Sequence, residues 1–215
     1  MSKCMSICLC LNVLLIAASA EAGTLTAFDS LGPQDLWAQG AFAWTISGNG
    51  SIVGLDISQG DAFTPTVAGN LQRIELGIMS VSGNFFSLAL YEATPNGGPL
   101  LWSGSVSNPS MPPMGSVGNL TVIDIVNGPA LETTKQYWLI SSTFGTTNLG
   151  WGFNVIGVNG LHASRISTSN PYALSTPDGS FGSATGAFRI LVPEPATLSL
   201  LALGGLAMVA RRRRR

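Results

Sequence analysis

Cysteine is scarce in this chain and confined to its first residues. The three cysteines of the 215-residue sequence are Cys4, Cys8 and Cys10. The rest of the chain can therefore form no disulfide framework, no thiolate metal site and no cysteine nucleophile. Its stability must come from core packing, and it is long enough for one domain with a real core.

Histidine and charge are also scarce. His162 is the single histidine, and charged residues make up 10% of the sequence. A zinc site needs several His or Cys ligands, and no serine lies in a G-x-S-x-G elbow that could use His162 in a triad. We therefore expect His162 to lie in a surface loop, and the sequence predicts no catalytic residue, no metal and no cofactor.

Basic residues are few between the two ends of the chain. Residues 23–190 contain four basic and nine acidic residues, which gives this part a formal net charge of −5. Binding of nucleic acid needs a basic face, so we expect no nucleic-acid partner.

Helical periodicity is absent from residues 23–190, and alternating strands take its place. Residues 71–79 and 85–92 place apolar side chains on one face and polar or small ones on the other. Asn49 and Gly50 predict a hairpin between strands at 41–46 and 51–57. Further strands are expected at residues 62–67, 100–106, 120–126, 136–142, 149–158 and 187–192. The pattern predicts an all-β domain, an antiparallel, jelly-roll-like β-sandwich over residues 23–190.

Residues 1–22 have the features of a secretory signal peptide. Lys3 supplies the positive charge, residues 7–17 form an apolar run, and small residues at Ala20 and Ala22 suit cleavage. We expect export through the Sec translocon and removal of this segment by signal peptidase.

The C-terminal segment, residues 191–215, has three parts. Pro193, Glu194 and Pro195 form a rigid, extended motif, because proline fixes φ and disfavours helix at the residue before it. Residues 196–210 are uncharged and predict an apolar helix, somewhat short for a permanent membrane span. Such a helix stops in a membrane with its basic end on the cytoplasmic side. That end is Arg211, Arg212, Arg213, Arg214 and Arg215.

This order of Pro-Glu-Pro, apolar helix and arginines resembles the PEP-CTERM sorting signal of Gram-negative bacteria that make exopolysaccharide. The same tail also carries an ice-binding protein C-terminal label, from which ice binding does not follow. The resemblance implies that an exosortase, a membrane protease-transpeptidase, cuts beside the motif. It implies transient anchoring in the inner membrane, then a place at the cell surface or outside the cell, released or covalently attached. An anchor that is never cut is the alternative.

The body of the chain is similar to the "choice-of-anchor" β-sandwich domains of exported bacterial proteins. The similarity covers about residues 40–144 and departs at Lys135, where that family usually has glycine. It implies a fold and no activity. The residues that carry it are Phe63, Leu71, Ile74, Leu76, Leu88, Leu90, Tyr91, Gly98, Pro99, Leu100, Leu101, Leu131, Tyr137, Trp138 and Leu139.

Three functions remain open for the body. It can be a non-catalytic structural or adhesive component of a biofilm matrix. It can instead bind exopolysaccharide through exposed tryptophans stacked on sugar rings, and Trp37 and Trp151 are the candidates because glycines and polar residues surround them. The least favoured function is a glycoside hydrolase using a pair from Glu75, Glu92 and Glu132, which we expect to be solvated. A calcium site at Asp56, Asp61 or Asp178 lacks a recognised spacing.

Overall fold

The computed structural model describes residues 23–38, 43–108, 110–116, 119–175 and 184–194. Within these ranges the chain is all-β: it contains no α-helix, and its one helical element is the 3-10 turn η1 (Pro33–Asp35). Contacts divide the chain into a body, Leu25–Val192, and a second unit made of Met1–Thr24 and Pro193–Arg215. The predicted fold class is confirmed.

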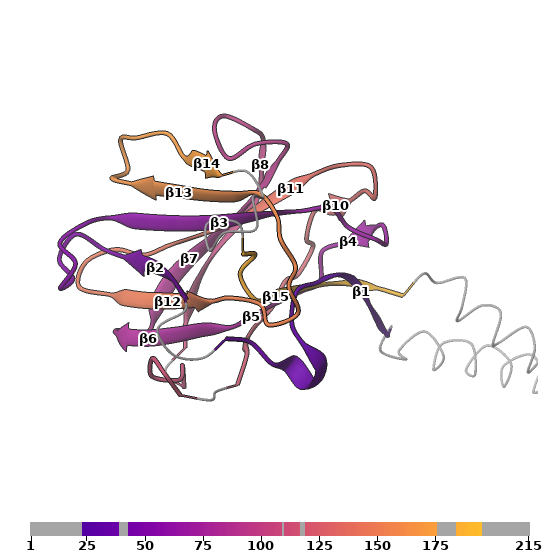
Figure 1. Cartoon of the computed structure of the whole chain (residues 1–215). Helices are drawn as coiled ribbons and strands as arrows, with labels where there is room; N and C mark the ends of the chain where they lie inside the picture. Colours follow the sequence, from indigo (N-terminus) through magenta and orange to yellow (C-terminus); the bar gives the residue numbers. More distant parts are fainter. Residues whose placement is uncertain (1–22, 39–42, 109, 117–118, 176–183, 195–215) are drawn as a thin grey trace, which may run out of the picture. The chain divides into compact units, whose positions relative to one another are not determined.

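Two main sheets build the body (Figure 1). The smaller sheet has the order β1 (Thr24–Asp29), β15 (Phe188–Pro193), β5 (Arg73–Leu76), β9 (Thr121–Asp124). The larger sheet has the order β6 (Ile78–Ser82), β12 (Asn148–Gly152), β2 (Ala43–Ser47), β3 (Ile57–Phe63), β11 (Tyr137–Ser142), β7 (Phe85–Glu92), β8 (Leu100–Ser107). β13 (His162–Ile166) pairs with β3, and β14 (Ala173–Ser175) pairs with β13. β4 (Gly69–Asn70) and β10 (Ala130–Leu131) form a separate antiparallel pair.

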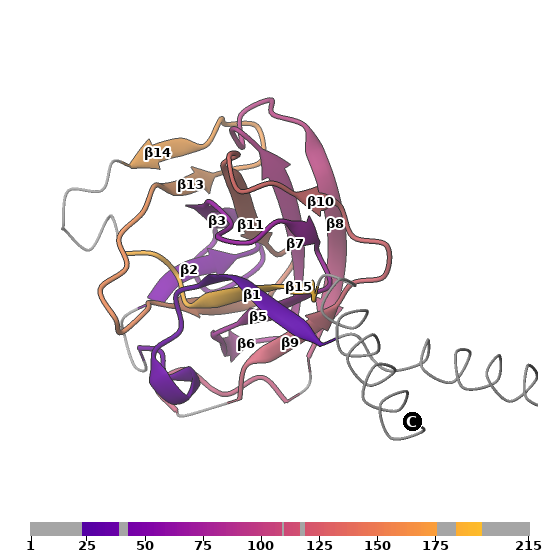
Figure 2. The ribbon, with the colours of Figure 1, turned by 90° about the vertical axis from the view of Figure 1, so that its right-hand side faces the viewer.

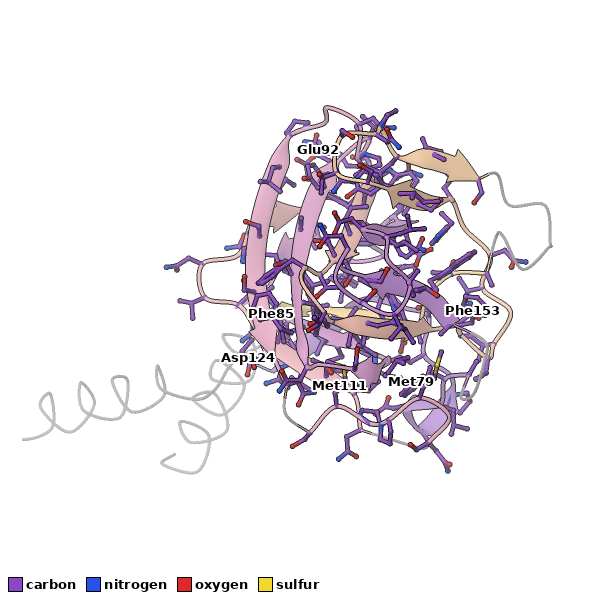
Figure 3. All side chains as sticks on the ribbon, turned by 90° about the vertical axis from the view of Figure 1, so that its left-hand side faces the viewer. Met79, Phe85, Glu92, Met111, Asp124 and Phe153 are labelled. Atoms are coloured by element: carbon purple, nitrogen blue, oxygen red, sulfur yellow. The ribbon has the colours of Figure 1, made fainter. Side chains whose placement is uncertain are left out.

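The two sheets face one another (Figure 2), and the main core lies between them, where side chains fill the space (Figure 3). The smaller sheet contributes Ile74 from β5 and Ile190 from β15, and the larger sheet contributes Leu88 from β7 and Leu139 from β11. β7 has the expected alternation: Phe86, Leu88 and Leu90 are buried and the residues between them are half-buried. Burial of these apolar side chains supplies the main stabilisation of the fold.

A second core covers the outer face of the larger sheet. Trp138 and Ile140 of β11 pack there with Ala163 of β13 and Tyr172. Tyr172 is held by Asn96, whose Oδ1 accepts from the Tyr172 amide at 2.7 Å. β11 is therefore covered on both faces, which explains why its residues 137–141 are all buried rather than alternating.

Several strand predictions need correction. Residues 71–79 are not one strand: β5 ends before Gly77, whose amide donates to the Ala187 carbonyl at 2.9 Å, and β6 continues in the other sheet. β2 and β3 are antiparallel neighbours, as the expected hairpin requires, but the tight turn at Asn49-Gly50 and the strand at residues 51–57 are wrong. Residues 48–56 form a loop, and the amides of Gly48 and Gly50 donate to the carbonyls of Thr147 and Gly145. Tertiary contacts with another loop prevail there over the local turn preference.

Five strands are absent from the sequence prediction, namely β1, β4, β10, β13 and β14. β13 has no apolar alternation, because its side chains enter a polar network and the second core. The predicted strand at residues 149–158 ends at Gly152, and the one predicted at 62–67 ends at Phe63 as the last part of β3.

Candidate functional site

The sorting motif begins directly at the end of β15. Pro193 is the last residue of that strand, and the amide of Glu194 donates to the Gly23 carbonyl at 2.7 Å. Pro195, the apolar residues 196–210, the run Arg211–Arg215 and the predicted signal peptide, residues 1–22, lie outside the described residues. None of the helices in the described ranges is both long and apolar enough to cross a membrane.

Both tryptophans expected to stack on sugars are buried. Trp37 is 3% exposed and Trp151 is 0% exposed. The expectation of exposure, which rested on their glycine-rich surroundings, is therefore wrong, and neither ring can serve as a stacking platform at the surface.

The neighbouring glycines explain this burial. A Cβ atom added at Gly77 would lie 2.8 Å from the Trp37 ring, and one added at Gly186 would lie 2.7 Å from the Trp151 ring. Each glycine leaves a slot that the indole fills, which suits a close-packed interior. The Trp151 indole also donates to the Ala187 carbonyl at 3.2 Å.

His162 is not in a surface loop, as expected, but on β13 and 3% exposed. Its Nδ1 lies 3.0 Å from Oδ1 of Asp61, and its Nε2 lies 2.9 Å from Oε1 of Gln59. The Trp44 ring stacks on the imidazole, with 3.7 Å between centroids and 13° between planes. Gln59 also donates to the Thr45 carbonyl at 2.9 Å.

The His162 network contains a histidine and a carboxylate, residue types that occur in catalytic sites. Its burial is typical of a network that stabilises the fold. Asp61 is 1% exposed, and its Oδ2 accepts from the Gly186 amide at 2.9 Å. The partners of His162 on β3 are thus fully engaged within the protein, and the Trp44 ring covers the imidazole. The network fastens β13 and residue 186 to β3.

The three glutamates considered for hydrolysis are paired with cations. Glu75 is less solvated than expected, and its Oε2 lies 2.9 Å from Nη1 of Arg189. Glu92 and Glu132 both bind Lys135, at 3.1 and 2.9 Å. Hydrogen bonds with Glu132 and Glu92 raise the pKa of Lys135 above its ordinary value. These carboxylates form ion pairs rather than a facing acid and base.

Arg189 is the centre of the largest of these ion-pair groups. Besides Glu75 it binds Asp29 at 2.9 Å and Asp35 at 2.6 Å. Desolvation lowers the pKa of Arg189, but the hydrogen bonds with Asp35 and Asp29 outweigh it and the pKa is raised. The group ties η1 and β1 to β15 and β5.

The aspartates considered for calcium do not lie together. Asp56 accepts from the Asn49 amide at 2.9 Å, Asp61 belongs to the His162 network, and Asp178 lies outside the described residues. Over the part of the chain that the structure describes, no three His, Cys, Asp or Glu side chains gather where a metal ion could bind.

A shallow pocket of about 320 Å³ opens beside the end of β3. Phe28 of β1 and Phe63 of β3 form part of its lining, and Gln136, Asn159 and Thr185 contribute polar groups. Sequence reasoning missed this pocket, because its residues come from widely separated segments and share no motif.

Comparison with known proteins identifies the C-terminal segment. Residues 191–215 match the model of the PEP-CTERM protein-sorting motif. The match does not extend to the body, so its similarity to choice-of-anchor domains stays a prediction. No curated protein matches the chain.

Among solved structures, the chain is similar to one titled "Structure of infectious bursal disease virus Gx strain". The identity is 12%, the match covers 89% of this chain and 48% of that one, and the TM-score is 0.21. The chain thus spans about half of the viral chain's length, and a TM-score this low supports no inference about fold or function.

Proposed function

From the PEP-CTERM protein-sorting motif at residues 191–215, we propose that this chain is a non-catalytic protein of the cell surface or extracellular matrix. In this proposal residues 1–22 direct export through the Sec translocon and are removed by signal peptidase. Residues 196–215 then hold the protein in the inner membrane, with Arg211–Arg215 on the cytoplasmic side. An exosortase then cuts beside Pro193, Glu194 and Pro195, and the body is released from the cell or attached to its surface.

The motif and its position carry this proposal. It follows β15 directly, so the body reaches the motif without a linker. The titratable groups that could support chemistry are engaged in internal contacts, as in the pairs of His162 with Asp61 and of Arg189 with Glu75. These contacts support a structural or adhesive role for the body.

The test replaces Pro193, Glu194 and Pro195 by alanine in the producing host. Intact mass and cell fractionation are measured for the variant and the parent. We expect the parent outside the inner membrane, without residues 1–22 and without the arginine run. The variant should keep the arginine run and stay in the inner membrane.

A matched control is Ser199→Ala, a conservative change in the same segment outside the motif. It should be processed as the parent is. Because Pro193 belongs to β15, protease resistance of the triple variant is compared with that of the parent to exclude misfolding. Normal processing and surface delivery of the folded triple variant would refute the sorting proposal. The mass of the processed parent also separates release from covalent attachment.

A further inference from the structure

β8 is an open edge of the larger sheet. It has eight residues, Leu100–Ser107, and it pairs with β7 on one side only (Figure 2). The strand contains no proline and no charged side chain. Its register with β7 is regular from residue 102 onward, because the one irregularity lies opposite the start of β8, between Leu90 and Tyr91. An edge of this length without such protection is a template for a further strand.

The backbone groups of β8 alternate between β7 and the open side. The Asn108 amide donates to the Asn84 carbonyl at 2.9 Å, which makes these two residues a hydrogen-bonded pair. In an antiparallel ladder such pairs recur at every second residue, so the even-numbered residues of 102–106 bond with β7. The amides and carbonyls of the odd-numbered residues of 103–107 therefore point to the open side. None of them has a hydrogen-bonding partner in the part of the chain that the structure describes.

The exposed side chains of β8 are small. Ser103, Ser105 and Ser107 are exposed, and the residues between them are half-buried. Serine presents little bulk to an incoming strand, and its hydroxyl can both donate and accept a hydrogen bond. Another uncharged strand can therefore approach β8 without steric or electrostatic conflict.

The other end strands of the two main sheets are covered or short. In β6, the Ser80 amide donates to the Pro112 carbonyl at 2.8 Å, and the Ser80 carbonyl accepts from the Met114 amide at 2.9 Å. In β1, the Ala27 carbonyl accepts from the Thr66 amide at 2.6 Å. β9 has only four residues. Among the four end strands, β8 is therefore both the longest and the one whose open side is not covered by described residues.

We propose that β8 pairs antiparallel with β8 of a second copy of this chain, which joins the two larger sheets into one. A second copy suits this edge because the two strands are equal in length and, without charge, do not repel each other. Without a charged side chain, β8 has no group that would select an acidic or basic partner instead.

The pairing of two β8 strands satisfies the hydrogen-bonding pattern of an antiparallel ladder. Pairing about Gly104 sets Ser103 of one copy opposite Ser105 of the other, and both residues have outward backbone groups. Serines that face each other across two strands can add side-chain hydrogen bonds. The contact uses the same surface on both copies, so it gives a closed dimer rather than a fibre. Dimerisation goes beyond the proposed sorting function and does not depend on it.

The test uses the protein purified from its producing host. Sedimentation equilibrium measures its mass over a wide range of protein concentrations, and NMR measures amide hydrogen exchange residue by residue. We expect a monomer–dimer equilibrium. With rising concentration, the amides of Ser103, Ser105 and Ser107 should become protected from exchange. The amides of Gly104 and Val106, which bond with β7, should be protected at every concentration.

Ser105→Pro is the decisive variant, because it removes an outward donor from each copy and leaves the hydrogen bonds between β8 and β7 in place. The dissociation constant of the dimer should rise at least about tenfold. Ser105→Thr keeps the amide and should dimerise as the parent does. Ser105→Lys also keeps the amide but sets like charges across the interface, so its weakened dimer should recover at high salt.

The proposal is overturned if the protein is monomeric at every concentration, or if folded Ser105→Pro and Ser105→Lys variants dimerise like the parent. Protection of the amides of Ser103, Ser105 and Ser107 in a monomer would also overturn it, because another segment of the same chain would then cover β8. Circular dichroism checks that each variant is folded. None of these results depends on cleavage at the sorting motif.

Discussion

Glycine residues decide where the tryptophans of this protein lie. Gly77 and Gly152 leave the space for the Trp37 ring, Gly186 leaves it for Trp151, and Gly104 lies under Trp102. A glycine in a strand costs conformational entropy, and here it permits an indole to pack directly on the backbone.

This arrangement predicts that Gly77→Ala destabilises the body. Its Cβ atom would lie 2.8 Å from the buried Trp37 ring and 3.2 Å from Cβ of Ala187, and neither neighbour has room to retreat. Overpacking of this kind should lower the free energy of unfolding by about 1–3 kcal/mol. The change in unfolding free energy is measured by urea denaturation, with tryptophan fluorescence as the signal.

Gly104→Ala is the matched control. A Cβ atom there would meet Trp102 at 2.7 Å, but Trp102 is half-buried on the edge strand β8 and can turn into solvent. The unfolding free energy of Gly104→Ala should fall by less than about 1 kcal/mol. Equal losses for the two variants would contradict the packing explanation.

A second residue-level prediction concerns His162. His162→Phe keeps a planar ring under Trp44 but leaves Oδ1 of Asp61 and Oε1 of Gln59 without their partner. Loss of these two buried polar contacts should cost about 2–4 kcal/mol of unfolding free energy. Ser164→Ala on the same strand should change it by less than about 0.5 kcal/mol. An unchanged denaturation midpoint for His162→Phe would show that the network adds nothing to stability.

At the scale of the element, Arg189 of β15 forms ion pairs with residues of η1, β1 and β5. Arg189→Met removes three ion pairs and leaves Asp29, Asp35 and Glu75 to repel one another. Because Arg189 is mostly buried while Asp35 is half exposed, we expect a loss of about 1–3 kcal/mol at low salt. The loss should shrink in 1 M NaCl, since salt screens that repulsion.

Arg73→Met provides the comparison for Arg189. Arg73 has one carboxylate partner, Asp124, and both side chains are largely in water. Its removal should cost less than about 1 kcal/mol. If both arginine variants lose the same stability, the three-carboxylate group has no special role.

Strands with a regular apolar alternation could be predicted, and those shaped by tertiary contacts could not. β7 matches its predicted range because Phe86, Leu88 and Leu90 face the core and the residues between them are only half-buried. β13 was missed because His162 is buried by bonds with Asp61 and Gln59, which lie about 100 residues earlier. A local sequence pattern cannot indicate hydrogen-bonding partners that lie so far away along the chain.

At the scale of the whole molecule, stability should reside in the body alone. The core residues belong to Leu25–Val192, and β15 has a hydrogen-bonded neighbour on each side. Deletion of residues 196–215 should change the free energy of unfolding by less than about 0.5 kcal/mol. Deletion from residue 188 onward should abolish folding, because it removes Phe188, Ile190 and Val192 from the core.

Circular dichroism and urea denaturation distinguish these two truncations. A large loss on deletion of residues 196–215 would mean that the segment after Pro195 supports the body. Cooperative unfolding of a chain that ends at residue 187 would mean that β15 is dispensable.

The whole-molecule prediction from sequence was right about class and tail. Composition and alternation were enough for an all-β fold, and the C-terminal motif is local, so residues 191–215 could be recognised without a structure. The pocket could not be predicted, because Phe28, Phe63, Gln136, Asn159 and Thr185 meet only after both sheets have formed.

The position of β15 in the smaller sheet also bears on the order in which the body can fold during synthesis. β15 lies between β1 and β5, yet it follows both of them in the sequence and is therefore synthesised after them. Until it arrives, β1 and β5 present unpaired edges, which are templates for aggregation. We therefore expect the smaller sheet to be complete only after β15 has been synthesised. Because Pro193 is the last residue of β15, the strand that completes the smaller sheet leads directly into the segment that matches the PEP-CTERM motif.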